Sequence, residues 1–117
     1  MKKMYHLSTC STCKKIIDQL PKDHGIELID IKSNNITERD LDYAAKHFGS
    51  YESVFSRKAM KYRSMGLNEK VLTESDYKNL ILNEYTFLKR PVTFIDNEVF
   101  AGNTKDSVTN LINKCNE

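Results

Sequence analysis

The sequence predicts an α/β layer fold with a mixed sheet, in the order β-α-β, helices, β-β-α. Strand-like and helical runs alternate near the start, helical patterns fill the middle, and two strand-like runs and a helix close the chain. Strands at both ends with helices between them are typical of a layered α/β fold. The chain has 117 residues, which fits one domain over residues 1–117 with a helical insertion over about 37–85.

The first third of the chain predicts a parallel β-α-β unit. Residues 3–7 alternate in polarity and end at a Ser-Thr turn, which indicates a strand. A helix follows from about Ser11 with apolar residues at helical spacing, and Pro21 ends it or disturbs its last turn. Residues 26–31 predict the second strand. A crossover of roughly 14–17 residues favours a parallel pairing of the two strands.

The middle of the chain, over residues 37–85, has a wholly helical pattern. Thr37 and Asp40 predict the N-terminal cap of a first helix, and Gly49 is placed to end it. A second helix is expected over 57–63, and a third opens at 73–76.

The end of the chain predicts an antiparallel hairpin followed by a helix. The runs 92–95 and 98–101 are rich in β-branched and aromatic residues, and only Asp96 and Asn97 separate them. The closing helix carries Val108, Leu111 and Ile112 at helical spacing.

Composition narrows the class of protein. The net charge of +2 excludes a polybasic nucleic-acid binder on charge alone, so no direct nucleic-acid partner is expected. No apolar run approaches the ~18 residues of a membrane span, and the basic start continues into no signal-peptide segment. We therefore expect a cytoplasmic protein without a membrane partner, in which three cysteines are not a disulfide framework.

The most informative motif is Cys10-Ser11-Thr12-Cys13, at the turn from the first strand to the first helix. A CxxC pair beside a β-α-β pattern predicts a thioredoxin-like redox site. Free backbone N–H groups at a helix start stabilise an anion, so the Cys10 thiolate is the expected nucleophile. Cys13 lies one turn further on, where it is able to resolve a mixed disulfide on Cys10.

Two other interpretations of the pair stay open. Both cysteines could be small residues packed on an apolar helix face. A zinc half-site is the other rival, although Cys115, His6, His24 and His47 show no ligand spacing, so no metal is expected. Cys115 is interpreted as an incidental thiol.

Over nearly its whole length the chain resembles the glutaredoxin-coupled arsenate reductase/Spx family of thioredoxin-fold proteins. The segments that carry the resemblance are Tyr5 to Cys10, Cys10 to Lys15, Phe55-Ser56-Arg57 with Tyr62 and Gly66-Leu67, and Leu88 to Val92. The resemblance implies a thioredoxin-like mixed sheet with a helical insertion. It also implies a cis peptide before Pro91, a structural residue near the site.

Carried over by motif, the resemblance assigns an oxyanion site. Cys10 corresponds to the cysteine that attacks arsenate, and Arg57 and Arg90 correspond to arginines that hold the oxyanion. Arginine presents a planar fork of donors suited to such oxygens, and the loop at Ser11 and Thr12 could supply N–H groups. Arg57 has a rival interpretation as solvated surface charge. The resemblance implies no bound cofactor, with glutathione and glutaredoxin, or thioredoxin, as the external reductant.

Two departures from the arsenate reductases favour an alternative function. Thr104 stands where they carry a third arginine, although Lys105 could partly replace it, and Cys13 stands where they usually carry serine. A second cysteine permits the intramolecular disulfide that Spx-like regulators use as a redox switch. The alternative is therefore an Spx-like regulator that binds the C-terminal domain of the RNA polymerase α subunit. Gly49 falls near the family's contact glycine, although a helix C-cap is the commoner reason for a glycine at such a position.

Overall fold

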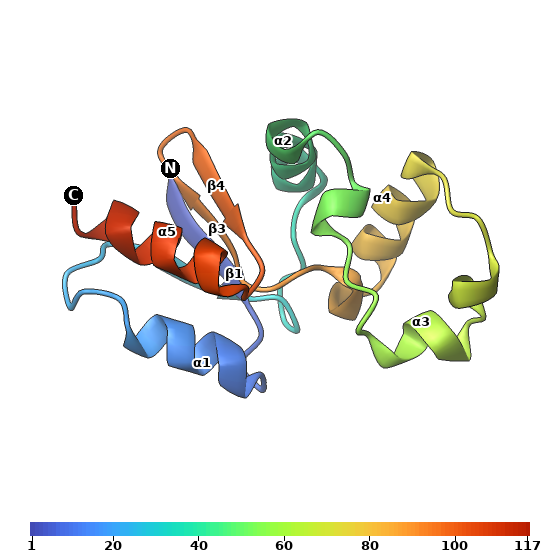
Figure 1. Cartoon of the computed structure of the whole chain (residues 1–117), viewed down its shortest axis with the longest axis horizontal. Helices are drawn as coiled ribbons and strands as arrows, with labels where there is room; N and C mark the ends of the chain where they lie inside the picture. Colours follow the sequence, from blue (N-terminus) through green and yellow to red (C-terminus); the bar gives the residue numbers. More distant parts are fainter. The chain divides into compact units, whose positions relative to one another are not determined.

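The computed structural model describes all residues from Met1 to Glu117. The chain divides into two compact units (Figure 1). Met1–Asn35 and Arg90–Glu117 form the first unit, and Ile36–Lys89 form the second. No helix is long and apolar enough to span a membrane.

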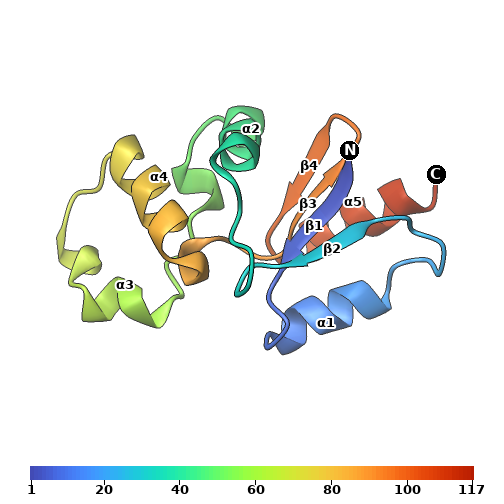
Figure 2. The same ribbon diagram turned by 180° about the vertical axis from the view of Figure 1, so that it is seen from behind.

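The first unit is built on a four-stranded mixed sheet in the order β2-β1-β3-β4, with β2 and β4 at its edges (Figure 2). The strands are β1 (Lys2–His6), β2 (Glu27–Asp30), β3 (Val92–Ile95) and β4 (Glu98–Ala101). The central strand β1 pairs parallel with β2 and antiparallel with β3, and β3 pairs antiparallel with β4. The predicted α/β fold class and the parallel β-α-β start are therefore confirmed.

Two helices, α1 (Ser11–Asp18) and α5 (Lys105–Cys115), pack against this sheet. Met4 and Ile95 of the sheet share one apolar cluster with Ile16 of α1 and Leu111 of α5. This packing holds the first turn of α1 at the end of β1, where the cysteine pair lies.

The second unit contains only helical elements. They are α2 (Glu38–Phe48), α3 (Met60–Ser64), α4 (Glu74–Asn83) and the short 3₁₀ helices η1 (Glu52–Val54), η2 (Leu67–Glu69) and η3 (Tyr85–Phe87). The expected helix over 57–63 is displaced, because α3 begins only at Met60. Residues 57–59 instead form a turn and a bend, which follow a bridge between Phe55 and Leu88.

The helix boundaries of the second unit follow from their caps. The hydroxyl of Thr37 accepts the N–H of Asp40 at 3.1 Å, and Gly49 closes α2 with a φ of 95°. Thr73 and Asp76 form a reciprocal capping box at the start of α4. The predicted N-terminal cap of α2, its end at Gly49 and the opening of a helix at 73–76 are therefore confirmed.

An aromatic cluster forms the centre of the second unit. The ring of Phe55 stacks on Phe87 with 5.1 Å between the ring centroids, and meets the ring of Tyr77 edge-on at 4.9 Å. Backbone hydrogen bonds from Ser56 to Phe87 and from Lys89 to Val54 fasten the same segments. This packing anchors the short stretch that carries Arg57.

Candidate functional site

Cys10 lies at the junction between β1 and α1. Its backbone is extended, with φ −92° and ψ 113°, and it occupies the N-cap position of α1. Its N–H donates to the carbonyl of Leu7 at 3.0 Å, which closes the turn after the strand. The cysteine therefore stands where the unpaired N–H groups of a helix start converge.

Four hydrogen-bond donors surround the Cys10 sulfur. Burial of the half-exposed Cys10 raises its pKa, but hydrogen bonds outweigh this effect and hold the pKa below the ordinary value. They come from the backbone N–H and the thiol of Cys13, the backbone N–H of Thr12, and the side chain of Arg90. Each bond stabilises the thiolate more than the thiol, and the thiolate is the nucleophilic form of cysteine.

The pKa of Cys13 is shifted in the opposite direction, upward. It is fully buried on the first turn of α1, and burial together with the charge of the neighbouring Cys10 raises its pKa to about 11. At neutral pH Cys13 is therefore a thiol that donates to Cys10. The side chains of the two cysteines lie within hydrogen-bonding reach of each other.

Arg90 and Pro91 border the same sulfur from the chain segment that enters β3. The peptide between Arg90 and Pro91 is cis, as the resemblance implied. Pro91 is buried, and its carbonyl accepts the N–H of Gly102 at 2.9 Å. Arg90 is partly exposed, and its side chain donates a hydrogen bond to the Cys10 sulfur. Ser11 and Thr12 are exposed beside Cys10.

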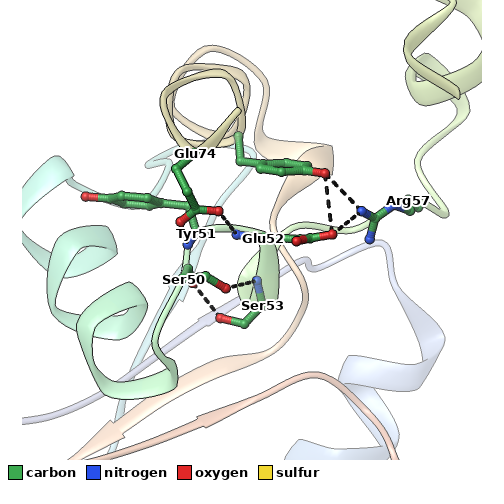
Figure 3. A network of polar contacts seen from close by, with 7 residues as sticks. Ser50, Tyr51, Glu52, Ser53, Arg57 and Glu74 are labelled. Atoms are coloured by element: carbon green, nitrogen blue, oxygen red, sulfur yellow. Dashed lines mark hydrogen bonds and ion pairs between the residues drawn. The ribbon is translucent and has the colours of Figure 1, made fainter. Parts of the chain in front are cut away.

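Arg57 belongs to the second unit and is held by residues of that unit (Figure 3). Its Nη2 atom donates to a carboxylate oxygen of Glu52 at 2.6 Å and to the Tyr77 hydroxyl at 3.0 Å. The Glu52 carboxylate also raises the pKa of Arg57. The part of Arg57 in an anion site with Cys10 stays a prediction.

The structure gives a local structural explanation for the other residues singled out in the sequence. Gly49 is the C-cap of α2, and a Cβ at its position would meet no atom within 4 Å. Thr104 caps α5, because its hydroxyl accepts the N–H of Ser107 at 3.2 Å. Cys115 packs against the apolar cluster under the sheet. No group of three or more His, Cys, Asp or Glu side chains is placed to hold a metal ion.

Sequence reasoning missed two residues that contact the candidate arginine, Glu52 and Tyr77. Glu52 and Tyr77 contact Arg57 from positions 5 and 20 residues away in the chain. A glutamate five residues before an arginine, in a segment rich in charges, gives no signal by itself. Only the folding of α4 beside η1 brings the Tyr77 hydroxyl to the same guanidinium.

Comparison with known proteins places this thiolate site in a family. A sequence model described as the ArsC family matches residues 5–111, nearly the whole chain. The chain therefore belongs to the ArsC family, with its thioredoxin-like fold and thiol-redox site. This confirms the resemblance found in the sequence.

Individual relatives agree with that assignment. The uncharacterized protein YusI of Bacillus subtilis (strain 168) is 28% identical over 107 residues, which are 87% of this chain and 90% of YusI. The solved structure of the YFFB protein has a TM-score of 0.79 at 23% identity, covering 96% of this chain and 99% of its own. A possible arsenate reductase from Streptococcus mutans UA159 has a TM-score of 0.75 at 24% identity, with 95% and 97% covered. At these identities the solved structures establish the fold alone.

Proposed function

We propose that the protein is a thiol oxidoreductase in which the Cys10 thiolate attacks an arsenate-like oxyanion or a disulfide. The observation that carries the proposal is the set of donors around Cys10, above all the side chain of Arg90. Arsenate is an anion and repels a thiolate, so their approach needs cations and N–H groups at the same point. Arg90 and the first N–H groups of α1 supply both, and Arg57 is the second proposed cation.

Thiols are the only reductant that the proposed reduction of arsenate to arsenite needs. The Cys10 sulfur displaces one arsenate oxygen, which leaves as water after protonation, and an S–As bond forms. A second thiolate, either that of Cys13 or that of an external thiol such as glutathione, then attacks the Cys10 sulfur. The S–As bond breaks, its electron pair stays on arsenic, and arsenite leaves while a disulfide forms. An external dithiol, glutaredoxin or thioredoxin, reduces that disulfide.

The test is arsenate-dependent NADPH oxidation coupled through glutathione and glutaredoxin. Wild-type protein should turn over, Cys10→Ser should not, and Cys115→Ser should match the wild type because Cys115 lies away from the site. Turnover no greater than that of Cys10→Ser would end the arsenate proposal. Reduction of a small disulfide substrate by the same preparations would then decide whether thiol exchange is the activity.

A second candidate function is a redox-regulated contact with the C-terminal domain of the RNA polymerase α subunit. Exposed aromatic side chains on α2 favour it, because Tyr43 and Phe48 are each 39% exposed beside the open surface at Gly49. Exposed aromatic residues are enriched where proteins bind one another. The cysteine pair would make that contact depend on the redox state.

A pull-down of the purified α C-terminal domain tests this candidate. The oxidised and reduced proteins should differ in the amount retained, and Cys13→Ser should remove the difference. Phe48→Ser should weaken retention in both states. Equal failure to bind in both redox states would exclude the regulator.

A further inference from the structure

The parallel strands β1 and β2 end side by side at one edge of the sheet (Figure 2). His6 at the end of β1 pairs in register with Asp30 at the end of β2. The turn that leads to Cys10 follows β1 directly, and Ser8 is its second residue. Functional side chains of α/β sheets collect beyond the carboxyl ends of such strands. Asp30 therefore borders the turn that carries the nucleophile.

The carboxylate of Asp30 holds the middle of that turn. Its Oδ1 atom accepts the backbone N–H of Ser8 at 3.3 Å, and the Ser8 hydroxyl donates to the same carboxylate. The backbone bond that closes the turn runs from Cys10 to Leu7, so it does not use the N–H of Ser8. Asp30 thus fastens the part of the turn that the closing bond leaves unheld.

Asp30 is itself held by the chain that follows β2. Its Oδ1 atom also accepts the backbone N–H of Lys32 at 3.2 Å, as aspartates do in tight turns. Its carbonyl accepts the N–H groups of Ser33 and Asn34 at 3.1 and 2.9 Å. A carboxylate restrained in this way presents its oxygens to the neighbouring turn in a defined direction.

Asp30 stays ionised, and so remains an acceptor, wherever thiols titrate. The Ser8 hydroxyl is the main reason that the pKa of Asp30 lies below its ordinary value. The backbone N–H groups of Lys32 and Ser8 and the charge of His6 lower that pKa further. The contact with the turn is therefore present over the whole pH range in which Cys10 gains or loses its proton.

The position of the Cys10 sulfur decides which donors reach it. Besides burial, the principal influences on the pKa of Cys10 are hydrogen bonds from Cys13, Thr12 and Arg90, and the charge of Asp30 is not among them. Hydrogen bonds weaken steeply with distance and misalignment. A turn that shifts the sulfur from the start of α1 loses these bonds, so the shape of the turn matters for the thiolate.

We propose that Asp30 is a positioning residue, whose carboxylate holds the turn at Ser8 and so keeps the Cys10 sulfur within reach of its donors. The proposal rests on the part of the proposed function in which Cys10 reacts as a thiolate, and it does not depend on arsenate as the substrate. All the residues that it uses belong to the first unit. Asp30 acts as an acceptor, so an uncharged acceptor at the same place should serve as well.

The experiment measures the rate at which iodoacetamide labels Cys10 across a pH series. The variants are Asp30→Ala, Asp30→Asn, Ser8→Ala, and Asp30→Ala combined with Ser8→Ala. Asp23→Ala is the matched control, since Asp23 is an exposed aspartate in another turn of the same unit. Thermal unfolding of each variant verifies the fold.

Asp30→Ala should slow labelling at neutral pH about two- to five-fold, as expected for losing exposed hydrogen bonds, and should move the midpoint upward. The rate at high pH, where Cys10 is fully ionised, should stay that of the wild type. Asp30→Asn keeps an acceptor oxygen and should restore the wild-type midpoint. Ser8→Ala keeps the N–H and should have a smaller effect, with no further loss when Asp30 is already alanine. Asp23→Ala should match the wild type.

The outcomes separate the positioning from the thiolate on which it rests. A wild-type midpoint at or above that of free cysteine would refute the activated thiolate and the positioning with it. A lowered wild-type midpoint that Asp30→Ala leaves unchanged would overturn the positioning alone, and a lower unfolding temperature of that variant would then show a merely structural role. Equal downward shifts in Asp30→Ala and Asp30→Asn would also overturn it, because Asp30 would then act through its negative charge. An upward shift in Asp30→Asn as large as that in Asp30→Ala would contradict a role as an acceptor.

Discussion

Cys13 donates both its backbone N–H and its thiol to the sulfur of Cys10, and the two cysteines titrate in opposite directions as a result. Burial raises the pKa of both thiols, but in Cys10 the hydrogen bonds outweigh it. In Cys13 the charge on Cys10 adds to burial and raises the pKa to about 11. Cys10 therefore favours the thiolate, the nucleophilic form, whereas Cys13 stays protonated at neutral pH.

Alkylation of Cys10 should follow a titration with a midpoint below about 8.5, the ordinary value for a free thiol. The rate rises with pH because the thiolate is the reactive form, and the lowered pKa of Cys10 moves that rise to lower pH. Cys13→Ala removes one donor and should move the midpoint upward. Cys13→Ser keeps a hydroxyl donor and should move it less.

The rate of iodoacetamide labelling across a pH series, followed by mass spectrometry of the peptide, provides the measurement. Cys115→Ser is the control and should leave the profile unchanged, because Cys115 belongs to a different part of the unit. A wild-type midpoint at or above that of a free cysteine would contradict an activated thiolate.

Mild oxidation should join Cys10 to Cys13 within one chain. The two thiols lie within hydrogen-bonding reach, and Cys115 lies among apolar residues of the sheet and α5. Diamide treatment should lower the mass of the peptide that contains both cysteines by about two hydrogen atoms, and dithiothreitol should restore it. Cys13→Ser should instead accumulate intermolecular or glutathione adducts at Cys10. A disulfide that includes Cys115 as the main product would disagree with the structure.

Thr73→Ala should lower the free energy of unfolding by about 0.5–2 kcal/mol, because it removes the capping box at the start of α4. Thr73→Ser keeps the oxygen and should recover most of the loss. Urea denaturation followed by circular dichroism measures both variants. Thr109→Ala, in the exposed interior of α5, should be neutral or slightly stabilising. Equal effects at the two threonines would show that helix propensity outweighs capping.

Thr93→Val should raise the free energy of unfolding by about 1 kcal/mol. Thr93 is fully buried in β3, and its hydroxyl has no hydrogen-bond partner. A buried hydroxyl without a partner is unfavourable, and valine has nearly the same shape. Thr93→Ala should do the reverse, since it leaves a cavity. Loss of stability in Thr93→Val, again by urea denaturation, would indicate that a buried water satisfies the hydroxyl.

Local sequence signals predicted most of the fold. The Thr37 and Thr73 caps, the closing Gly49 and the Asp96-Asn97 turn each bring their own hydrogen bonds or backbone preference, so their consequences are local. The start of α3 was displaced because the pairing of Phe55 with Leu88 is long-range. The spacing of apolar residues near residue 57 does not indicate that Phe55 pairs with Leu88, more than thirty residues along the chain.

Part of the local geometry around the two cysteines could also be predicted. The turn with the two cysteines could be predicted because its signal lies within four residues. The CxxC spacing places both thiols at a helix start, where backbone N–H groups stabilise a thiolate. The hydrogen bond from the Arg90 side chain to Cys10 joins the two chain segments that make up the first unit. The composition of the chain does not predict it. Only the family resemblance predicted that Arg90 lies near Cys10. The contacts of Glu52 and Tyr77 with Arg57 had no signal in the sequence, because these residues meet only after folding.

The chain leaves the first unit after Asn35 and returns to it at Arg90, so one contiguous insert carries the whole second unit. Cys10 and Cys13 are encoded outside that insert, whereas Arg57 and its contacts Glu52 and Tyr77 are encoded inside. Under the proposed function, the two groups of residues are therefore able to evolve separately. Exchange of the insert between relatives should change which anion is preferred while the reactivity of the thiolate is inherited unchanged.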